Sequence, residues 1–469
     1  MDPTELGFTS ALALAQLIRS KEVSPVEVVD GLLERIERLN PRLNAFCTVL
    51  GDEVRAAARK AEAAARRGEP LGPLDGVPVA IKDQVNVAGV RVAFGSHLLA
   101  DTVATEDAPM VVRLRAAGAI VLGMTTMPEF GWQGHSWSPL YGMTRNPWHP
   151  ERSAGGSSAG SAVAVAAGLV PLAMGSDGAG SIRIPASFCG VVGLKPTYGR
   201  VAMYPVSLSE MVTHYGPLAR TVRDAALMLD AMAGPDPRDP FCLPAPDEEY
   251  LAACDGGARG LRIGWSPDLG YASVDPEVAT LCAAAARRFA DLGCEVEEAK
   301  PGFSDPIWAA DQYLLAGAAN RVWDHLPDWA DKMDPGFVAA VRMMAERTLF
   351  DSARARAQRY ELAATMAAFF QRYDLLVTPT MPGVAFGTDR TERPYQPGLG
   401  WSPFTYPFNL TGEPAISVPC GWTEAEGLPV GLQIVGPRFA EGRVVRAAAA
   451  FEAAQAWSER RPELAIEPG

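Results

Sequence analysis

The chain has 469 residues, of which 48% are hydrophobic and 21% are charged, a composition typical of a globular protein with a sizeable core. Its formal net charge of −13 argues against nonspecific binding to nucleic acid or to an anionic membrane, because both would be repelled. The first residues lack the basic and apolar segments of a secretory signal, and no apolar stretch is long enough to span a bilayer. We therefore expect a cytoplasmic protein whose partners are small molecules, without a nucleic-acid or membrane partner.

The N-terminal part of the chain has helical patterns followed by a strand. Residues 10–39 alternate apolar and polar positions at helical spacing, and Ser24-Pro25 marks the start of the second of two helices. Residues 53–67 predict a further exposed helix, which Gly68 ends. The apolar run 77–81 then predicts a strand that ends at Lys82.

Helices and strands alternate in the next part of the chain. Residues 107–117 and 158–167 are helical by pattern, whereas 119–123 and 169–174 are short apolar runs typical of buried strands. Such alternation favours the α/β class, in which helices cover both faces of a sheet. The size of the chain favours a mixed sheet over a purely parallel one.

A turn-rich connector at residues 233–240 leads into a region without a recognisable motif. Residues 261–265 and 294–298 resemble strands that flank a helix at 278–292, and residues 306–372 are mostly helical by pattern. The aromatic side chains of this last stretch could line a pocket, although simple packing is the more common role. They are Trp308, Tyr313, Trp323, Phe337 and Phe350.

Two serines in glycine-rich turns, Ser157 and Ser181, point to hydrolytic chemistry, and a lone lysine, Lys82, precedes both. Glycines let backbone N–H groups turn toward one point, which is how an oxyanion is held. The five histidines stand in no recognisable triad motif, which leaves lysine as the candidate base. To act near neutral pH, the lysine must lose about three units from its usual pKa.

Three segments carry a family resemblance: GVPVAIKD, GGSSAGSAVAVAAG and GSDGAGSIRIPASFCGVVGLKPT. In this order and spacing they resemble the amidase signature family, and weaker traces extend over most of the chain. The resemblance implies a large twisted mixed β-sheet with helices on both faces, in one domain over residues 1–469. Within it we expect an N-terminal helical segment 1–70, a signature core 71–235, a variable, mostly helical substrate-side region 236–372, and a C-terminal part 373–469 that returns to the core sheet.

The same resemblance implies roles for the polar residues of these segments. Ser181 is the nucleophile, Ser157, expected after a cis peptide bond, relays the proton, and a neutral Lys82 accepts it. The oxyanion hole is assigned to the backbone N–H groups of the nucleophile turn, in which an alanine replaces the family's more usual glycine. Asp177 and Arg183 flank this turn and are expected to orient it. The expected oxyanion-hole residues are Gly178, Ala179 and Gly180, together with Ser181 itself.

These roles imply an amidohydrolase without metal or cofactor that cleaves small amides through an acyl-enzyme. Apolar or aryl amides are the expected substrates, as in aryl acylamidases, ω-amino-acid oligomer hydrolases and urethanases, so carbamates remain open. Trp132, Tyr141 and Met203 lie near the signature segments and are candidates for the pocket wall. Free-standing relatives are often homodimers, and the N-terminal helices offer a surface for such contact.

Other interpretations fit the sequence less well. Ser158 lies in a G-x-S-x-G pattern, but residues 146–152 before it are polar and interrupted by proline, unlike the strand that such a nucleophile needs. Arg183 stands where a dinucleotide-binding motif needs its third glycine. Ile184 replaces the glutamine typical of tRNA-dependent amidotransferases, which remain an alternative, as does a catalytically silent relative.

The seven cysteines form no CxxC pair and no metal-binding spacing, so we expect reduced and mostly buried thiols. A nucleophilic role for Cys189 is conceivable, but its apolar neighbours favour simple packing.

Overall fold

An 11-stranded mixed sheet forms the centre of the computed structural model, which describes residues 1–207, 209, 211–389 and 400–466. The strand order is β1-β3-β2-β6-β8-β7-β12-β13-β11-β9-β10. The strands are β1 (Phe46–Val49), β2 (Pro78–Lys82), β3 (Ile120–Thr125), β6 (Leu172–Asp177), β7 (Val192–Lys195), β8 (His214–Ala219), β9 (Arg262–Trp265), β10 (Glu295–Glu298), β11 (Leu375–Pro379), β12 (Ala415–Trp422) and β13 (Pro429–Val435). A small separate hairpin pairs β4 (Trp137–Ser138) with β5 (Gly142–Met143).

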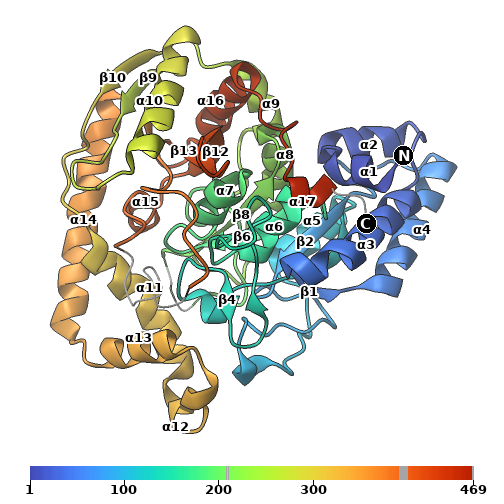
Figure 1. The fold of residues 1–469 in the computed structure, drawn as a ribbon, viewed down its shortest axis with the longest axis horizontal. Helices are drawn as coiled ribbons and strands as arrows, with labels where there is room; N and C mark the ends of the chain where they lie inside the picture. Colours follow the sequence, from blue (N-terminus) through green and yellow to red (C-terminus); the bar gives the residue numbers. More distant parts are fainter. Residues whose placement is uncertain (208, 210, 390–399, 467–469) are drawn as a thin grey trace.

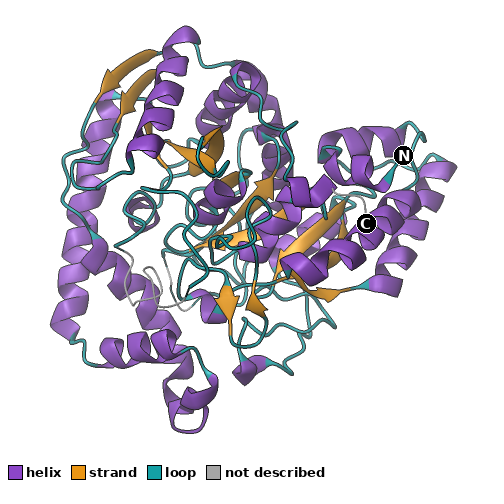
Figure 2. Ribbon diagram, viewed as in Figure 1, coloured by secondary structure: helices purple, strands orange, loops and turns teal. Residues whose placement is uncertain are grey.

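Helices cover the sheet on both faces, as the sequence predicts (Figure 2). Helices α6 and α7 pack together against the central strands, whereas α8, α10 and α16 form a second group on the sheet. The helices are α1 (Pro3–Phe8), α2 (Ala11–Arg19), α3 (Pro25–Leu43), α4 (Gly51–Arg67), α5 (Pro109–Ala116), α6 (Ala159–Ala166), α7 (Arg183–Cys189), α8 (Val222–Met232), α9 (Tyr250–Ala253), α10 (Pro276–Asp291), α11 (Ile307–Val322), α12 (Leu326–Trp329), α13 (Pro335–Ala345), α14 (Leu349–Arg372), α15 (Pro407–Thr411), α16 (Glu441–Ala454) and α17 (Glu463–Ile466).

The N-terminal helices lie together at one end of the molecule (Figure 1). Helix α3 begins at the predicted place, because Ser24 caps it and Glu27 bonds back to the Ser24 backbone in a capping box. The sequence pattern does not reveal α1, a short helix that starts where the Asp2 side chain accepts the N–H groups of Thr4 and Glu5.

The central strands match the sequence prediction with one shift. Residues 169–174 are expected to form a strand, but the strand β6 begins only at Leu172. Leu169 and Val170 instead donate their N–H groups to the carbonyl of Ala164 and so close the C-terminus of α6. Helix α6 itself consists of buried small residues, which lets it pack closely on the sheet.

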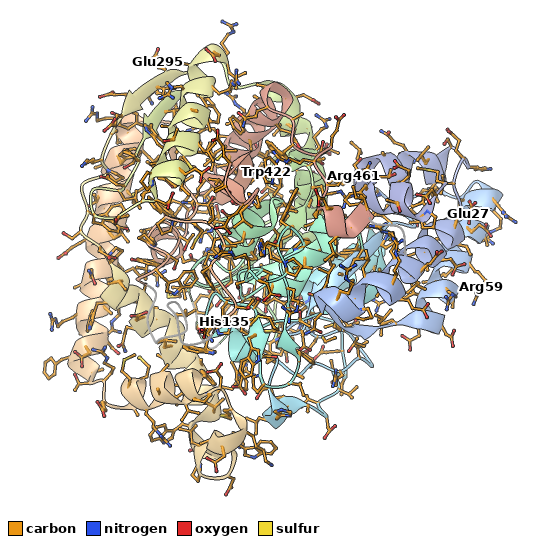
Figure 3. All side chains as sticks on the ribbon, in the orientation of Figure 1. Glu27, Arg59, His135, Glu295, Trp422 and Arg461 are labelled. Carbon is orange, nitrogen blue, oxygen red and sulfur yellow. The ribbon has the colours of Figure 1, made fainter. Side chains whose placement is uncertain are left out.

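The two ends of the fold differ from its centre. Strands β9 and β10 pair in parallel around α10, as predicted, and continue into β11. Helices α11–α14 run outside the sheet along one side of the molecule (Figure 1). Charged side chains such as Glu27, Arg59 and Glu295 lie on the outside (Figure 3). Within the described ranges, none of the helices is both long and apolar enough to cross a membrane.

Candidate active site

Lys82 is the last residue of β2, a central strand between β3 and β6, and its side chain is completely buried. Its Nζ lies 2.7 Å from the Oγ of Ser157, 3.0 Å from that of Ser158 and 2.9 Å from that of Ser176. Burial lowers the pKa of Lys82 well below its ordinary value, and the negative charge of Asp177 opposes this only in part. A neutral lysine amine therefore sits among three serine hydroxyls.

The hydrogens available in this cluster single out one of the three serines. A neutral amine has two hydrogens and one lone pair, and each hydroxyl has one hydrogen. The Ser158 hydroxyl donates to the carbonyl of Ser176, and the Ser176 hydroxyl donates to Oε1 of Gln84. Both serines can then only accept from Lys82, so the lone pair of the amine faces the hydroxyl hydrogen of Ser157.

Ser157 lies in the tight loop before α6, and its side chain is 2% exposed. The Gly156–Ser157 peptide bond is cis, as expected from the resemblance. Neighbouring backbone leaves no room for larger residues here. A Cβ on Gly156 would lie 2.3 Å from the carbonyl oxygen of His135, and one on Gly131 would lie 3.1 Å from the Ser157 Oγ. Glycines at these positions let two loops meet at the hydroxyl.

Ser181 lies in the turn between β6 and α7, and a carboxylate shapes this turn from behind. Asp177 accepts the N–H groups of Gly180 at 2.6 Å and of Ile182 at 3.2 Å. Arg183 binds both oxygens of the same carboxylate at 2.9 Å, and both side chains are fully buried. Burial raises the pKa of Asp177, but the charge and hydrogen bonds of Arg183 outweigh it and hold the pKa well below the usual range.

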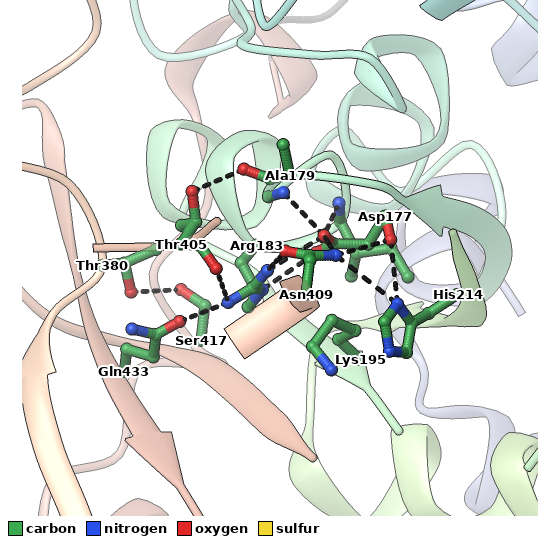
Figure 4. Close-up of polar contacts among 12 residues, drawn as sticks. Asp177, Ala179, Arg183, Lys195, His214, Thr380, Thr405, Asn409, Ser417 and Gln433 are labelled. Atoms are coloured by element: carbon green, nitrogen blue, oxygen red, sulfur yellow. Dashed lines mark hydrogen bonds and ion pairs between the residues drawn. The ribbon is translucent and has the colours of Figure 1, made fainter. Parts of the chain in front are cut away.

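A second layer of side chains holds the Asp177–Arg183 pair (Figure 4). Arg183 donates to the carbonyl of Thr405 at 3.0 Å, to Oε1 of Gln433 at 2.7 Å and to Oδ1 of Asn409 at 2.6 Å. Asn409 donates in turn to the Asp177 carboxylate and carbonyl, and the Thr405 hydroxyl donates to the carbonyl of Ala179. The turn is therefore fixed by residues more than two hundred positions away in sequence.

The backbone of the turn modifies the oxyanion hole that the sequence suggests. The Gly180 N–H is donated to Asp177 and is not directed at a substrate. In the described part of the chain, the N–H groups of Gly178, Ala179 and Ser181 have no acceptor. Gly180 has a φ of +125°, and a Cβ there would lie 2.4 Å from the Thr405 Oγ1, so only glycine fits. Ala179 is not at a positive φ, so its methyl group causes no strain.

Ser157 and Ser181 line one cavity of about 70 Å³, which also reaches Ser176 and Gly178. Among the described residues no hydrogen bond joins the two hydroxyls, and such bonds often tighten only when substrate is bound. One face of α11 closes the cavity. The lining consists of Gln84, Phe94, Phe130, Gly131, Ser157, Ser176, Gly178, Ser181, Ser207, Ser209, Thr213, Leu314, Gly317, Ala318 and Arg321.

The three side chains suggested for the pocket wall lie outside this lining. Trp132 packs against Phe337, with ring centroids 6.1 Å apart. The Tyr141 hydroxyl donates to the carboxylate of Asp83 at 2.8 Å, and Met203 is buried in the main core. Nearness in sequence to the signature segments did not bring these residues to the cavity, because each packs into a neighbouring cluster.

The rival nucleophiles are also placed elsewhere. The Ser158 side chain is fully buried against Lys82 and is not part of the cavity lining. Cys189 is buried, its Sγ points to the carbonyl of Ala154, and burial raises the pKa of its thiol. His214 lies behind the nucleophile turn, where its Nδ1 is 2.7 Å from the carbonyl of Val212, and burial lowers its pKa.

The variable helical region supplies only part of what the sequence suggests. Of its aromatic residues, Phe337 is buried in a cluster of its own, whereas Trp323 and Phe350 are 49% and 83% exposed. Trp308 and Tyr313 pack against a second cluster. Packing, the more common role, is therefore what the described lining of the cavity indicates for these side chains.

Comparisons with known proteins agree with this geometry. The Amidase family profile matches residues 27–445. An acylamidase from Rhodococcus erythropolis is 40% identical over 477 residues, 98% of each chain, and a glutamyl-tRNA(Gln) amidotransferase component from Moorella thermoacetica is 38% identical over 98% of this chain and 100% of its own. A bacterial aryl acylamidase superimposes with a TM-score of 0.91 at 31% identity, covering 98% of this chain and 99% of that one. A 6-aminohexanoate cyclic dimer hydrolase with bound substrate gives 0.89 at 32% identity, with the same coverage. The chain therefore belongs to the amidase signature family and is an amidohydrolase that acts on the carbon–nitrogen bond of amides.

Proposed function

We propose that the protein hydrolyses small apolar or aryl amides, with Ser181 as nucleophile, Ser157 as proton relay and Lys82 as base. The observation that carries the proposal is the 2.7 Å contact between Lys82 and Ser157 at the edge of a cavity that Ser181 also lines. A lysine of lowered pKa can take a proton near neutral pH, and a serine between it and the nucleophile can pass that proton on.

In the first half-reaction the Ser181 Oγ attacks the amide carbonyl carbon and loses its proton to the Ser157 Oγ. Ser157 passes its own hydrogen to the lone pair of Lys82, so the negative charge moves to the carbonyl oxygen. The carbon–nitrogen bond then breaks as Ser157 protonates the leaving amine and recovers a hydrogen from Lys82. The products are a free amine and an ester of Ser181, and Lys82 is neutral again.

In the second half-reaction water takes the place of the amine. Ser157 removes a proton from the water and transfers its hydrogen to Lys82, and the hydroxide adds to the ester carbonyl. Collapse of this intermediate breaks the bond to the Ser181 Oγ, which regains a proton through the same relay. The carboxylic acid leaves, and the enzyme returns to its starting state.

The developing oxyanion is assigned to the N–H groups of Gly178, Ala179 and Ser181. Removal of one such donor typically costs about 10²–10³ in rate. The Asp177–Arg183 pair and Asn409 hold the turn, so these donors are in place before the charge develops. Rigid donors lower the barrier because they need no reorganisation at the moment of reaction.

The substrate class follows from the walls of the cavity. Phe94, Phe130 and Leu314 are apolar, and an aryl or alkyl group would pack on them. Carbamates are included, because their carbonyl is attacked in the same way and the reaction releases carbon dioxide in addition. The acylamidase and aryl acylamidase among the similar proteins support this class.

The test is hydrolysis of p-nitroanilides, aryl amides and p-nitrophenyl carbamates by the purified protein, Ser181→Ala and Lys82→Ala. Hydrolysis by the unaltered protein that both substitutions abolish is the expected result. Absence of hydrolysis by the unaltered protein would favour the amidotransferase-type or the silent alternative. Ile184 stands against the amidotransferase, whose turn typically has glutamine there.

The proposal extends to the organisation of the protein. The segments 1–70, 71–235, 236–372 and 373–469 act as one domain in the cytoplasm, and a homodimer is the expected assembly. Light scattering after gel filtration measures the assembly, and a single cooperative unfolding transition is the expected sign of one domain.

A further inference from the structure

Arg321 is the one charged side chain in the described lining of the catalytic cavity. The rest of that lining is apolar or carries hydroxyl and amide groups, with no aspartate or glutamate among the described members. The mechanism proposed above uses no cation at this place. A guanidinium beside the nucleophile therefore needs another explanation.

The position of Arg321 follows from the geometry of α11. Leu314, Gly317, Ala318 and Arg321 are spaced by three and four residues, so they share one face of the helix, and this face closes the cavity. The hydroxyl of Ser209 donates to the Leu314 carbonyl at 2.7 Å and ties the helix to the opposite wall. The small residues Gly317 and Ala318 leave the cavity open up to Arg321.

The guanidinium group of Arg321 is held but not neutralised by its described neighbours. It lies over the ring of Phe94, 4.8 Å from the centroid, and Phe94 lines the same cavity. No carboxylate of the described chain forms an ion pair with it, and burial lowers its pKa from 12.5 without removing its charge at neutral pH. A partly buried cation of this kind favours an anionic partner.

Comparison with Arg183 makes the point clearer. Arg183 is fully buried and spends its donors on Asp177, Asn409, Gln433 and the Thr405 carbonyl. Arg321 keeps its planar set of five N–H donors, a shape that matches a carboxylate. The thirteen excess negative charges of the chain would repel an anionic substrate in general, so a local cation is what such a substrate would need.

We propose that Arg321 forms an anion subsite, and that the preferred substrates are short amides that carry a carboxylate. This proposal rests on the hydrolase function proposed above and specifies its substrate. The aryl or alkyl part of the substrate packs on Phe94 and Phe130, and the carboxylate meets the guanidinium group. Because Ser181 and Arg321 share a cavity of only about 70 Å³, a short chain separates the carboxylate from the scissile carbonyl.

The test compares matched pairs of substrates. N-(4-nitrophenyl)succinamic acid has its carboxylate on the acyl side, and 4-nitrobutyranilide is its neutral counterpart. For the amine side, 4-butyramidobenzoate is compared with 4-butyramidobenzamide. In one of these pairs the unaltered enzyme should show a kcat/KM about ten- to a hundredfold higher for the anion, as a charge-assisted hydrogen bond provides. Equal or lower values for the anion in both pairs would overturn the proposal.

Two variants of the same residue assign the preference. Arg321→Gln should lower the anion-to-neutral ratio of kcat/KM by about ten- to a hundredfold, and Arg321→Lys should lower it less, because it keeps the charge but loses the planar donors. The matched control is Arg347→Gln, which also removes an arginine stacked on an aromatic ring, that of Trp308, but one outside the cavity lining. A fall in both substrates alike with Arg321→Gln would show a structural role and contradict the subsite.

A binding measurement separates this proposal from the hydrolase proposal. Calorimetric titration of the unaltered protein and of Arg321→Gln with succinamate reports the subsite without any turnover. If the enzyme hydrolyses nothing but binds succinamate at least about tenfold more tightly than Arg321→Gln does, the hydrolase proposal fails and the subsite stands. Equal binding by the two proteins overturns the subsite whatever the activity.

Discussion

Two regions meet at the catalytic cavity, and they are built on different terms. The nucleophile turn, Asp177–Arg183, is held by hydrogen bonds to buried side chains of the core on all sides. The facing wall, α11, belongs to a helical layer outside the sheet, and its arginine has no described ion-pair partner. The difference teaches that the reaction is fixed by the core, whereas selectivity is left to a wall that can change without disturbing it.

The largest effect is expected at the nucleophile. Ser181→Ala should lower kcat by about 10⁴–10⁶, because the remaining donors and binding groups supply only the residual catalysis. Initial-rate assays with a p-nitroanilide measure it. Ser158→Ala serves as the control for the adjacent serine pattern, and loss of an acyl-enzyme signal in that variant instead would reassign the nucleophile.

The base comes next. Lys82→Met should lower kcat/KM by about 10²–10⁴, the usual contribution of general acid–base catalysis. Because the lysine acts when neutral and burial has lowered its pKa, activity should fall as the pH drops through that lowered pKa and stay high above it. The pH profile of kcat/KM in the unaltered enzyme checks this, and a profile flat from acid to alkaline pH would rule out a neutral lysine base.

The core pair should control stability as well as rate. Arg183→Met leaves the Asp177 charge buried without its partner and should lower the free energy of unfolding by about 3–5 kcal/mol. Urea denaturation measures the change. The control, Arg223→Met, removes an exposed pair with Asp255 and should cost less than about 1 kcal/mol. Similar losses in the two variants would mean that burial of the pair contributes little.

Ser176 should have a smaller and more specific effect. Its oxygen accepts from Lys82 and stabilises the protonated amine, so Ser176→Ala should lower the pKa of Lys82 further and move the acid limb of kcat/KM to lower pH. A loss of about tenfold in kcat is expected from the less well held amine. Ser161→Ala removes a buried hydroxyl that donates to the Met174 carbonyl and should leave the acid limb in place.

The smallest effect is expected on the outer wall. Leu314→Ala should raise KM for aryl anilides by about three- to tenfold, through lost apolar contact, and leave the acid limb of the profile unchanged. Steady-state kinetics over a range of pH checks both statements. A large fall in kcat would mean that the helical wall positions the reacting groups and would blur the contrast between the two regions.

The sequence predicts the fold class and most central elements, because local signals agree with the tertiary structure. Ser24 and Pro25 begin α3, and the alternation of strands and helices gives the mixed sheet. The position of β6 is shifted, since an apolar run does not reveal that Leu169 and Val170 close α6. The strand order could not be read, because β7 and β12 are neighbours in space but far apart in the chain.

The candidate site was predictable only where motifs mark it. Lys82, Ser157 and Ser181 stand in glycine-rich or signature segments, and the structure brings the lysine to one serine and both serines to one cavity. The roles of Ser176 and Gln84 depend on which hydrogens are already donated, which no spacing records. Arg321 lies in the region without motifs, and its only sequence signal is the helical spacing it shares with Leu314.

The supports of the nucleophile turn come from the last part of the chain, and this sets an order on how the protein matures. During synthesis on the ribosome, Asp177 and Arg183 emerge long before Asn409 and Gln433, their buried partners. Strand β7 likewise waits for β12, which inserts between it and β13 in the middle of the sheet. A nascent chain that ends before β12 therefore carries all three candidate catalytic side chains without the framework that aligns them, so hydrolysis begins only after the C-terminal strands have docked.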